Sequence, residues 1–247
     1  MRSSPTWAYN GGARSWGDAG NNAKWLGAYG TGFDDRGQMH YRSGLNMIPL
    51  IEWYRANPDD QFLLEVSMGA ITGQLTNIDP DQGAPGMMWW ALPHMMTHDP
   101  HSGDYGLGFF GHALESGAYF VVHKQLGQLC YLCDLQQSET AATNDKVLIT
   151  PKDSFRRNVF IEPLGLYLIA EAGRFATLEL DLAAKMLVIN FDFQASENEL
   201  FTSFRLKLQK TSVSRPGSNF KVTDGALVRG AYEIKALPGA KAQINWE

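Results

Sequence analysis

Residues 204–209 read Phe-Arg-Leu-Lys-Leu-Gln, and this strict alternation of apolar and polar side chains decides how the second half of the chain folds. Successive side chains of a strand point to opposite faces, so the alternation predicts an antiparallel strand with one buried and one solvated face. Residues 187–193, Leu-Val-Ile-Asn-Phe-Asp-Phe, repeat the pattern. We expect the buried faces to include Leu187, Ile189, Phe191, Phe204, Leu206 and Leu208.

Turn-forming sequences separate further stretches of this kind. Glu171-Ala172-Gly173-Arg174 and Asp181-Leu182-Ala183-Ala184-Lys185 predict hairpin turns, and Gly and Pro recur near 215–217 and 238–239. Seven or eight such strands predict an antiparallel β-sandwich over residues 141–247. We interpret this second region mainly as scaffold.

The first region, residues 1–140, has the spacing of helices instead. Met47, Leu50, Ile51 and Tyr54 recur on one helical face and predict a helix over 43–55. Pro49 lies inside this segment, so the helix either kinks there or begins only near Ile48. Asn-Pro-Asp-Asp at 57–60 ends it and caps a second helix over about 59–76, and a third is expected over about 109–123. Helices followed by strands give an α+β fold.

The charge of −5 is unevenly distributed. Residues 1–140 hold 7 Lys/Arg and 14 Asp/Glu, together with all six histidines and six of the seven tryptophans. A nucleic-acid partner would require a basic face, which this composition does not supply. No apolar run is long enough to span a membrane, so we expect no membrane partner either. An acidic, aromatic-rich region suits a neutral, hydroxyl-rich ligand.

The only cysteines form the sequence Cys130-Tyr-Leu-Cys133. Its context, Gln-Leu-Cys-Tyr-Leu-Cys-Asp-Leu, favours an extended segment in which positions three apart point to opposite faces. Two sulfurs on opposite faces cannot bond, so we expect structural free thiols. Two ligands alone are also too few for a structural zinc site.

Four motifs resemble a bacterial and fungal family of unknown function, DUF5695. They are Tyr-Asn-Gly-Gly-Ala-Arg-Ser-Trp-Gly-Asp-Ala-Gly-Asn-Asn (9–22), His-Tyr-Arg-Ser-Gly-Leu-Asn (40–46), Gly-Asp-Tyr-Gly-Leu-Gly-Phe-Phe-Gly-His (103–112) and Lys-Asp-Ser-Phe-Arg-Arg (152–157). The resemblance spans most of the chain and implies a relationship to six-hairpin glycosidases, whose helices form an (α/α) toroid flanked by β-domains. A full toroid needs twelve helices, and this sequence predicts three to five. The resemblance therefore implies a partial toroid-like helical region, from the C-terminal part of a longer relative.

Glycoside hydrolysis requires two carboxyl groups, one of them kept protonated by its surroundings. Asp104 and Asp18 are the favoured candidates, because flanking glycines allow a ligand to approach the backbone closely. The alternative is that each is a helix N-cap. Further acid/base candidates are Asp99 and Glu115, the latter one turn inside the third helix and equally suited to a solvated or capping role. The candidate substrate-binding residues are Trp89, Trp90, Tyr105, His112, His40, Tyr41 and Arg42.

Two other chemistries fit parts of the same region. His40, Tyr41, Arg42 and Asn46 include the residue types of a polysaccharide lyase, although the acidity of this region disfavours a polyanionic substrate. His94, His98 and His101 approach the spacing of a zinc site, but Pro93 and Pro100 break the local helix. We therefore expect no metal and no cofactor.

The sequence thus predicts a carbohydrate-active protein, most simply a glycoside hydrolase-like enzyme acting on a neutral poly- or oligosaccharide. The alternatives are a non-catalytic carbohydrate-binding or assembly fragment and a polysaccharide lyase. A helical region with too few helices would expose apolar flanks with side chains such as Phe62, Met68 and Leu114, so we expect a homodimer formed through it. The alternative is that the helices repack into a compact bundle on the sheet, which needs no partner. The N-terminus lacks the apolar core of a signal peptide. We expect an extracellular or periplasmic protein whose export signal lies outside this chain, with a cytoplasmic location as the alternative.

Overall fold

The computed structural model describes residues 40–73, 115–137, 146–153, 155–192, 203–212, 215, 219–237 and 239–247. Within the two helices it describes the side chains of residues 48–68 only. By its contacts the chain divides into two units. The first comprises Met1–Tyr54 and Asp59–Ser116, and the second comprises Arg55–Pro58 and Gly117–Glu247. Each unit is described by itself.

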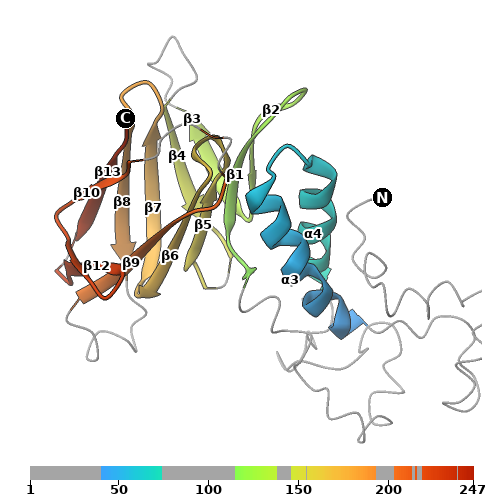
Figure 1. Cartoon of the computed structure of the whole chain (residues 1–247), viewed down its shortest axis with the longest axis horizontal. Coiled ribbons are helices and arrows are strands. Elements are labelled where there is room, and N and C mark those ends of the chain that lie inside the picture. The colour runs from blue at the N-terminus through green and yellow to red at the C-terminus, as the bar shows by residue number, and fades with distance from the viewer. Residues whose placement is uncertain are drawn as a thin grey trace, which may run out of the picture. The chain divides into compact units, whose positions relative to one another are not determined.

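The predicted helical hairpin is confirmed (Figure 1). Helix α3 spans His40–Ala56 with Pro49 inside it, and helix α4 spans Gln61–Gly73. Asp60 caps α4 as predicted, because its Oδ1 accepts a hydrogen bond from the backbone N–H of Leu63 at 3.1 Å. Ile51 and Tyr54, two of the four apolar residues that predicted α3, are fully buried.

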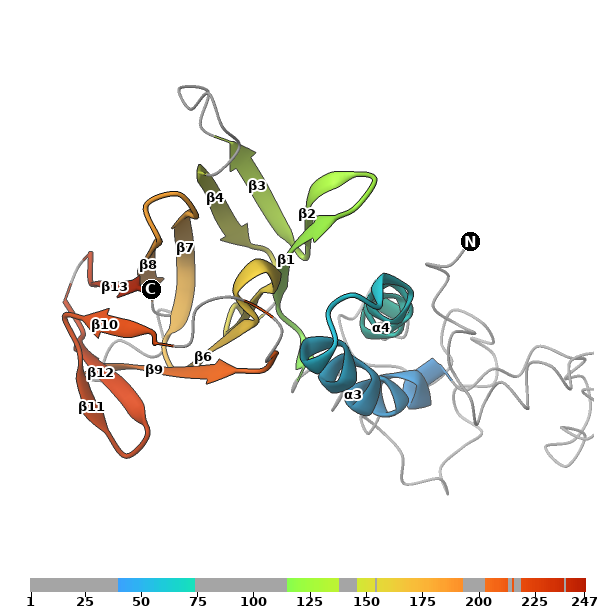
Figure 2. The ribbon, with the colours of Figure 1, turned by 45° about the horizontal axis from the view of Figure 1, so that its top comes forward.

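The second unit consists of two packed β-sheets, which confirms the predicted β-sandwich (Figures 1 and 2). The seven-stranded sheet has the order β11-β12-β9-β6-β5-β1-β2, and the six-stranded sheet the order β10-β13-β8-β7-β4-β3. Neighbouring strands are antiparallel except for β1 and β5, which are parallel. The strands are β1 (Ala118–His123), β2 (Gly127–Tyr131), β3 (Cys133–Gln137), β4 (Lys146–Pro151), β5 (Asn158–Ile161), β6 (Leu166–Ala172), β7 (Arg174–Asp181), β8 (Met186–Asp192), β9 (Ser203–Lys210), β10 (Lys221–Thr223), β11 (Ala226–Val228), β12 (Ala231–Lys235) and β13 (Lys241–Asn245).

The core between the sheets is built from the residues that alternation predicted. Leu187, Ile189 and Phe191 of β8 and Phe204 and Leu206 of β9 are all buried there. Leu208 packs against the same core and is partly buried. The predicted register is therefore right in both strands, because a slip of one residue would have turned these side chains to solvent.

The expected partial (α/α) toroid is wrong. Helices α3 and α4 form a single hairpin, and strands dominate the rest of the described residues. The segment expected as a third helix over 109–123 forms strand β1 from Ala118 onward. Its sequence, Ala-Tyr-Phe-Val-Val-His, is aromatic and β-branched, which favours a strand wherever a sheet can bury it. Strands β2 and β3 likewise lie within residues 1–140, the region expected to be helical.

Several connections pass from one sheet to the other at the same end of the sandwich. These are β2 to β3, β4 to β5 and β6 to β7. Backbone hydrogen bonds join them: the N–H of Lys152 donates to the carbonyl of Leu132 at 2.8 Å, and that of Phe175 donates to the carbonyl of Arg156 at 2.7 Å. We call this end the switching end. The turn at Glu171–Arg174, expected as a hairpin, is one of these crossings, whereas Asp181–Lys185 joins the paired strands β7 and β8 as predicted.

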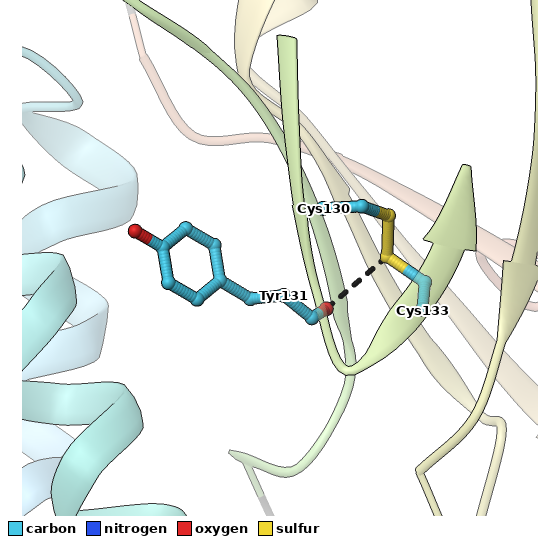
Figure 3. Close-up of a disulfide and its surroundings, with 3 residues drawn as sticks. All are labelled: Cys130, Tyr131 and Cys133. Carbon is cyan, nitrogen blue, oxygen red and sulfur yellow. Dashed lines mark hydrogen bonds between the residues drawn. A yellow bond between two sulfur atoms is a disulfide. The ribbon is translucent and has the colours of Figure 1, made fainter. Parts of the chain in front are cut away.

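A disulfide between Cys130 and Cys133 closes the first crossing, so the expectation of free thiols is wrong (Figure 3). The expectation assumed one continuous strand through both cysteines. Instead β2 ends at Tyr131, and Leu132 adopts a left-handed conformation with φ of 55° before β3 begins. This turn reverses the alternation and brings the two Cα atoms to 5.5 Å, within the range of disulfides.

Candidate functional site

Most of the residues selected from the sequence lie outside the described part of the chain. They are Asp18, Asp99, Asp104, Trp89, Trp90, Tyr105 and His112. His40, Tyr41 and Arg42 form the first turn of helix α3, but their side chains are outside the described set. The assignment of Asp104 and Asp18 as the acid/base pair therefore stays a prediction.

Glu115 is the one acid/base candidate whose side chain is described. It is the last helical residue before Ser116, Gly117 and strand β1, and not one turn inside a helix that reaches residue 123. The side chain is 8% exposed, so a solvated role is wrong. Gly117 fixes the approach to β1, because a Cβ there would lie 2.6 Å from the carbonyl oxygen of Asn158.

The outward face of the six-stranded sheet carries the chemistry that the structure does describe. Cross-strand pairing aligns Gln136 of β3 with Leu148 of β4, and Leu148 with Glu179 of β7. The same row continues through Val188 of β8 to Gln243 of β13. The positions next to this row in each strand are buried in the core. They are Val147, Leu178, Leu180, Leu187, Ile189, Ala242 and Ile244. A row of amide, carboxylate and aliphatic side chains therefore crosses five strands on the outer face.

Hydrogen bonds organise part of this face. Asn190 Nδ2 donates to Thr177 Oγ1 at 2.9 Å and to Glu179 Oε1 at 3.5 Å. On β13, Gln243 Nε2 donates to Asn245 Oδ1 at 2.9 Å. The longer contact of Asn190 links the amide on β8 to the Glu179 carboxylate on β7.

An open cleft lies beside Glu179, at the ends of β3 and β4 that are remote from the switching end. It has a volume of about 270 Å³ and is lined by Gln136, Gln137, Lys146, Val147, Leu148 and Glu179. We call it the β3–β4 cleft. Gln137 is held by its own contact, since its Nε2 donates to Gln128 Oε1 of β2 at 3.2 Å.

The β3–β4 cleft can donate and accept hydrogen bonds without presenting a net charge. Lys146 supplies an ammonium donor, Glu179 a carboxylate acceptor, and the glutamine amides supply both kinds of group. Leu148 offers an apolar surface between Gln136 and Glu179. The sequence did not predict the cleft, because Gln136 and Gln137 lie in the region expected to be helical and the other four residues lie in the region interpreted as scaffold. The available signal was the polar half of the alternation in β3, β4 and β7, which marked an exposed face but not a concave one.

The described residues contain neither a candidate metal site nor a candidate membrane span. No group of three or more His, Cys, Asp or Glu side chains is placed to hold a metal ion among them. In the same residues, no helix has the length and apolar character needed to cross a bilayer. The described part of the site is a hydrogen-bonding cleft on one sheet of the β-sandwich, in which one lysine and one glutamate balance each other's charge.

Comparison with known proteins gives the chain its family. Residues 1–244 match DUF5695, a family of unknown function, and the protein belongs to this family. No curated protein matches the chain. No solved structure matches it either.

Proposed function

We propose that this protein is carbohydrate-active and acts on a neutral poly- or oligosaccharide. The supporting observation is the β3–β4 cleft on the six-stranded sheet, where amide, ammonium and carboxylate groups lie around aliphatic side chains. Sugars present hydroxyl groups that both donate and accept hydrogen bonds, and C–H surfaces that pack against apolar side chains. The chain has 21 Lys and Arg against 26 Asp and Glu, so its composition does not favour a polyanionic ligand.

The chemical step is assigned to residues 1–140, as a glycoside hydrolase-like reaction. One carboxyl group protonates the leaving oxygen, and a second acts as base or nucleophile. Asp104 and Asp18 are the preferred pair, followed by Asp99 and Glu115. Glu115 is buried, with 8% of its surface exposed.

The test is release of reducing ends from a panel of neutral polysaccharides by the full chain. Asp104→Asn and Asp18→Asn should each lower the rate by at least about 100-fold, because a general acid or base contributes on the order of 10²–10⁴. Asp59→Asn, at an exposed position between α3 and α4, is the matched control and should leave the rate unchanged. Full activity in both Asp104→Asn and Asp18→Asn would remove these residues from the mechanism.

A non-catalytic binding protein is the second candidate. The observation that favours it is that only one carboxylate, Glu179, lines the β3–β4 cleft, so this cleft by itself lacks the pair that hydrolysis needs. Calorimetry separates the two candidates. A binding protein gives heat of binding with a neutral oligosaccharide and releases no reducing ends over the same period.

We also propose an extracellular or periplasmic location. The support is the Cys130–Cys133 disulfide, because disulfides form and persist in oxidising compartments and are rare in the cytosol. Alkylation of the protein in lysates of its native cells, followed by mass measurement, tests this. Two alkylated cysteines in the freshly quenched protein would place it in a reducing compartment.

A further inference from the structure

We infer that the β3–β4 cleft is a binding site for one internal unit of a neutral oligosaccharide chain. This inference rests on the proposed function and gives it a second site. The residues that carry it are Gln136, Lys146, Leu148 and Glu179, which come from three adjacent strands of the six-stranded sheet.

The arrangement of polar groups around an aliphatic centre matches a sugar ring. Leu148 is the register partner of Gln136 on one side and of Glu179 on the other. Opposed side chains in such a row lie about 4.5–5.5 Å apart at their Cβ atoms, so the three span roughly 10 Å, about the length of one or two sugar units. A ring lying on Leu148 would have its hydroxyls within reach of an amide at one edge and a carboxylate at the other.

The charges of the cleft select for a neutral ligand. Lys146 and Glu179 carry opposite charges, and the other four lining residues are uncharged. A uronate or sulfated sugar would gain from Lys146 but would be repelled by Glu179. A neutral sugar can instead accept a hydrogen bond from the ammonium and donate one to the carboxylate, and bonds of this charged kind are the stronger ones.

The size and openness of the cleft favour an internal unit over a chain end. Sites that enclose a small molecule usually measure about 300–1,000 Å³ and cover most of the ligand. The β3–β4 cleft, at about 270 Å³, lies on a sheet surface and is open to solvent. It can contact one unit while the chain continues on both sides.

The cleft and the acid/base candidates lie in different units of the chain. Asp18, Asp99, Asp104 and Glu115 belong to the first unit, and all cleft residues belong to the second. Substitutions in the cleft therefore leave all four acid/base candidates in place, so binding and reducing-end release can be measured on the same variants.

The experiment is calorimetry of the full chain with four neutral tetrasaccharides, cellotetraose, xylotetraose, mannotetraose and maltotetraose, and with tetragalacturonate as the charged comparison. The variants are Gln136→Ala and Glu179→Gln. The control is Gln209→Ala, an exposed glutamine on the other sheet. Loss of a hydrogen bond to the Glu179 carboxylate should weaken binding of the preferred tetrasaccharide about 10-fold, with a smaller loss for Gln136→Ala and none for Gln209→Ala. In the unchanged protein, the methyl NMR signals of Val147 and Leu148 should shift on addition of the same sugar.

Three results would overturn the inference, and they are distinguishable. If a neutral tetrasaccharide binds but the cleft variants and the methyl signals do not respond, the β3–β4 cleft is not the binding site and the proposed function stands. If only tetragalacturonate binds, the assignment of a neutral ligand is wrong. If no tetrasaccharide binds and no reducing ends are released, the proposed function fails together with the cleft. The methyl signals of the unchanged protein keep the test valid should a variant fail to fold.

Discussion

The guanidinium of Arg55 lies against two tyrosine rings of the seven-stranded sheet. Its Nη1 donates to the hydroxyl of Tyr119 at 2.9 Å, and its Cζ lies 4.2 Å from the centre of the Tyr167 ring. Arg55 is only 7% exposed, and its backbone carbonyl accepts a hydrogen bond from Thr211 Oγ1 at 3.0 Å. By its contacts, the segment Arg55–Pro58 belongs to the second unit, although in the sequence it lies between the rest of α3 and α4.

Replacement of Arg55 should destabilise the sandwich strongly. Arg55→Met keeps much of the aliphatic length but removes the cation–π contact and leaves the buried Tyr119 hydroxyl without this donor, so we expect a loss of about 3 kcal/mol. Lys207→Met, at an exposed position of β9, is the control and should change the free energy of unfolding by less than about 0.5 kcal/mol. Urea denaturation measures both, and equal effects of the two variants would contradict this role of Arg55.

Gly173 is required by two independent constraints. Its φ is 80°, and a Cβ there would lie 2.3 Å from Cδ1 of Phe204, whose ring stacks on that of Phe191. Gly230 has a similar φ of 78° but nothing within 4 Å of the added atom. Gly173→Ala should cost about 3 kcal/mol or more, and Gly230→Ala about 1 kcal/mol, because only the former adds core overpacking to the backbone strain. Thermal and urea unfolding of the two variants give the comparison, and similar losses would show that the Phe204 ring moves aside freely.

At the scale of elements, the strands were predictable where alternation continued uninterrupted. Strands β7, β8 and β9 needed only the period of two and the Asp181–Lys185 turn, both of which are local. The crossings at Leu132 and Gly173 depend on which sheet the next strand joins, and this is decided by partners distant in the chain. The local sequence around Cys130 and Cys133 therefore predicts one strand where two are found. The sequence of β1 predicts a helix because its strand partners, like those at the crossings, are distant in the chain.

The disulfide should stabilise the corner between β2 and β3 by a modest amount. It closes a loop of only four residues, and the loop-entropy relation gives about 2 kcal/mol for a loop of this length. We expect the unfolded, unreduced protein to show no free thiols, and reduction to lower the free energy of unfolding by about this amount. The control is Cys130→Ala with Cys133→Ala, whose stability should not respond to reductant. A response of the double variant would mean that the reductant acts elsewhere.

For the candidate site too, local sequence reveals some residues and not others. Residue types in 1–140 suggested carboxylate chemistry, but the residues concerned, apart from Glu115, lie outside the described structure. The β3–β4 cleft could not be found from sequence because Gln136, Leu148 and Glu179 are separated by up to 43 positions and meet only through pairing of three strands. Each of them alone has the appearance of an ordinary outward-facing residue.

At the scale of the whole molecule, self-association remains a prediction with a changed basis. The toroid flanks that suggested it do not exist among the described helices, and Met68, one of the proposed flank residues, is 5% exposed. Phe62 on α4 is nevertheless 58% exposed, and Trp53 on α3 is 63% exposed. Large apolar side chains at the surface of one hairpin favour contact between two copies.

Light scattering across a dilution series should therefore show a dimer that dissociates at low concentration. Phe62→Lys should shift the protein towards monomer, since it places a charge at the expected contact. The matched control is Leu227→Lys on strand β11, where the leucine is 64% exposed, and it should leave the equilibrium unchanged. A monomer at high concentration would contradict the predicted dimer. An equal effect of both variants would show that the contact does not lie on the helical hairpin.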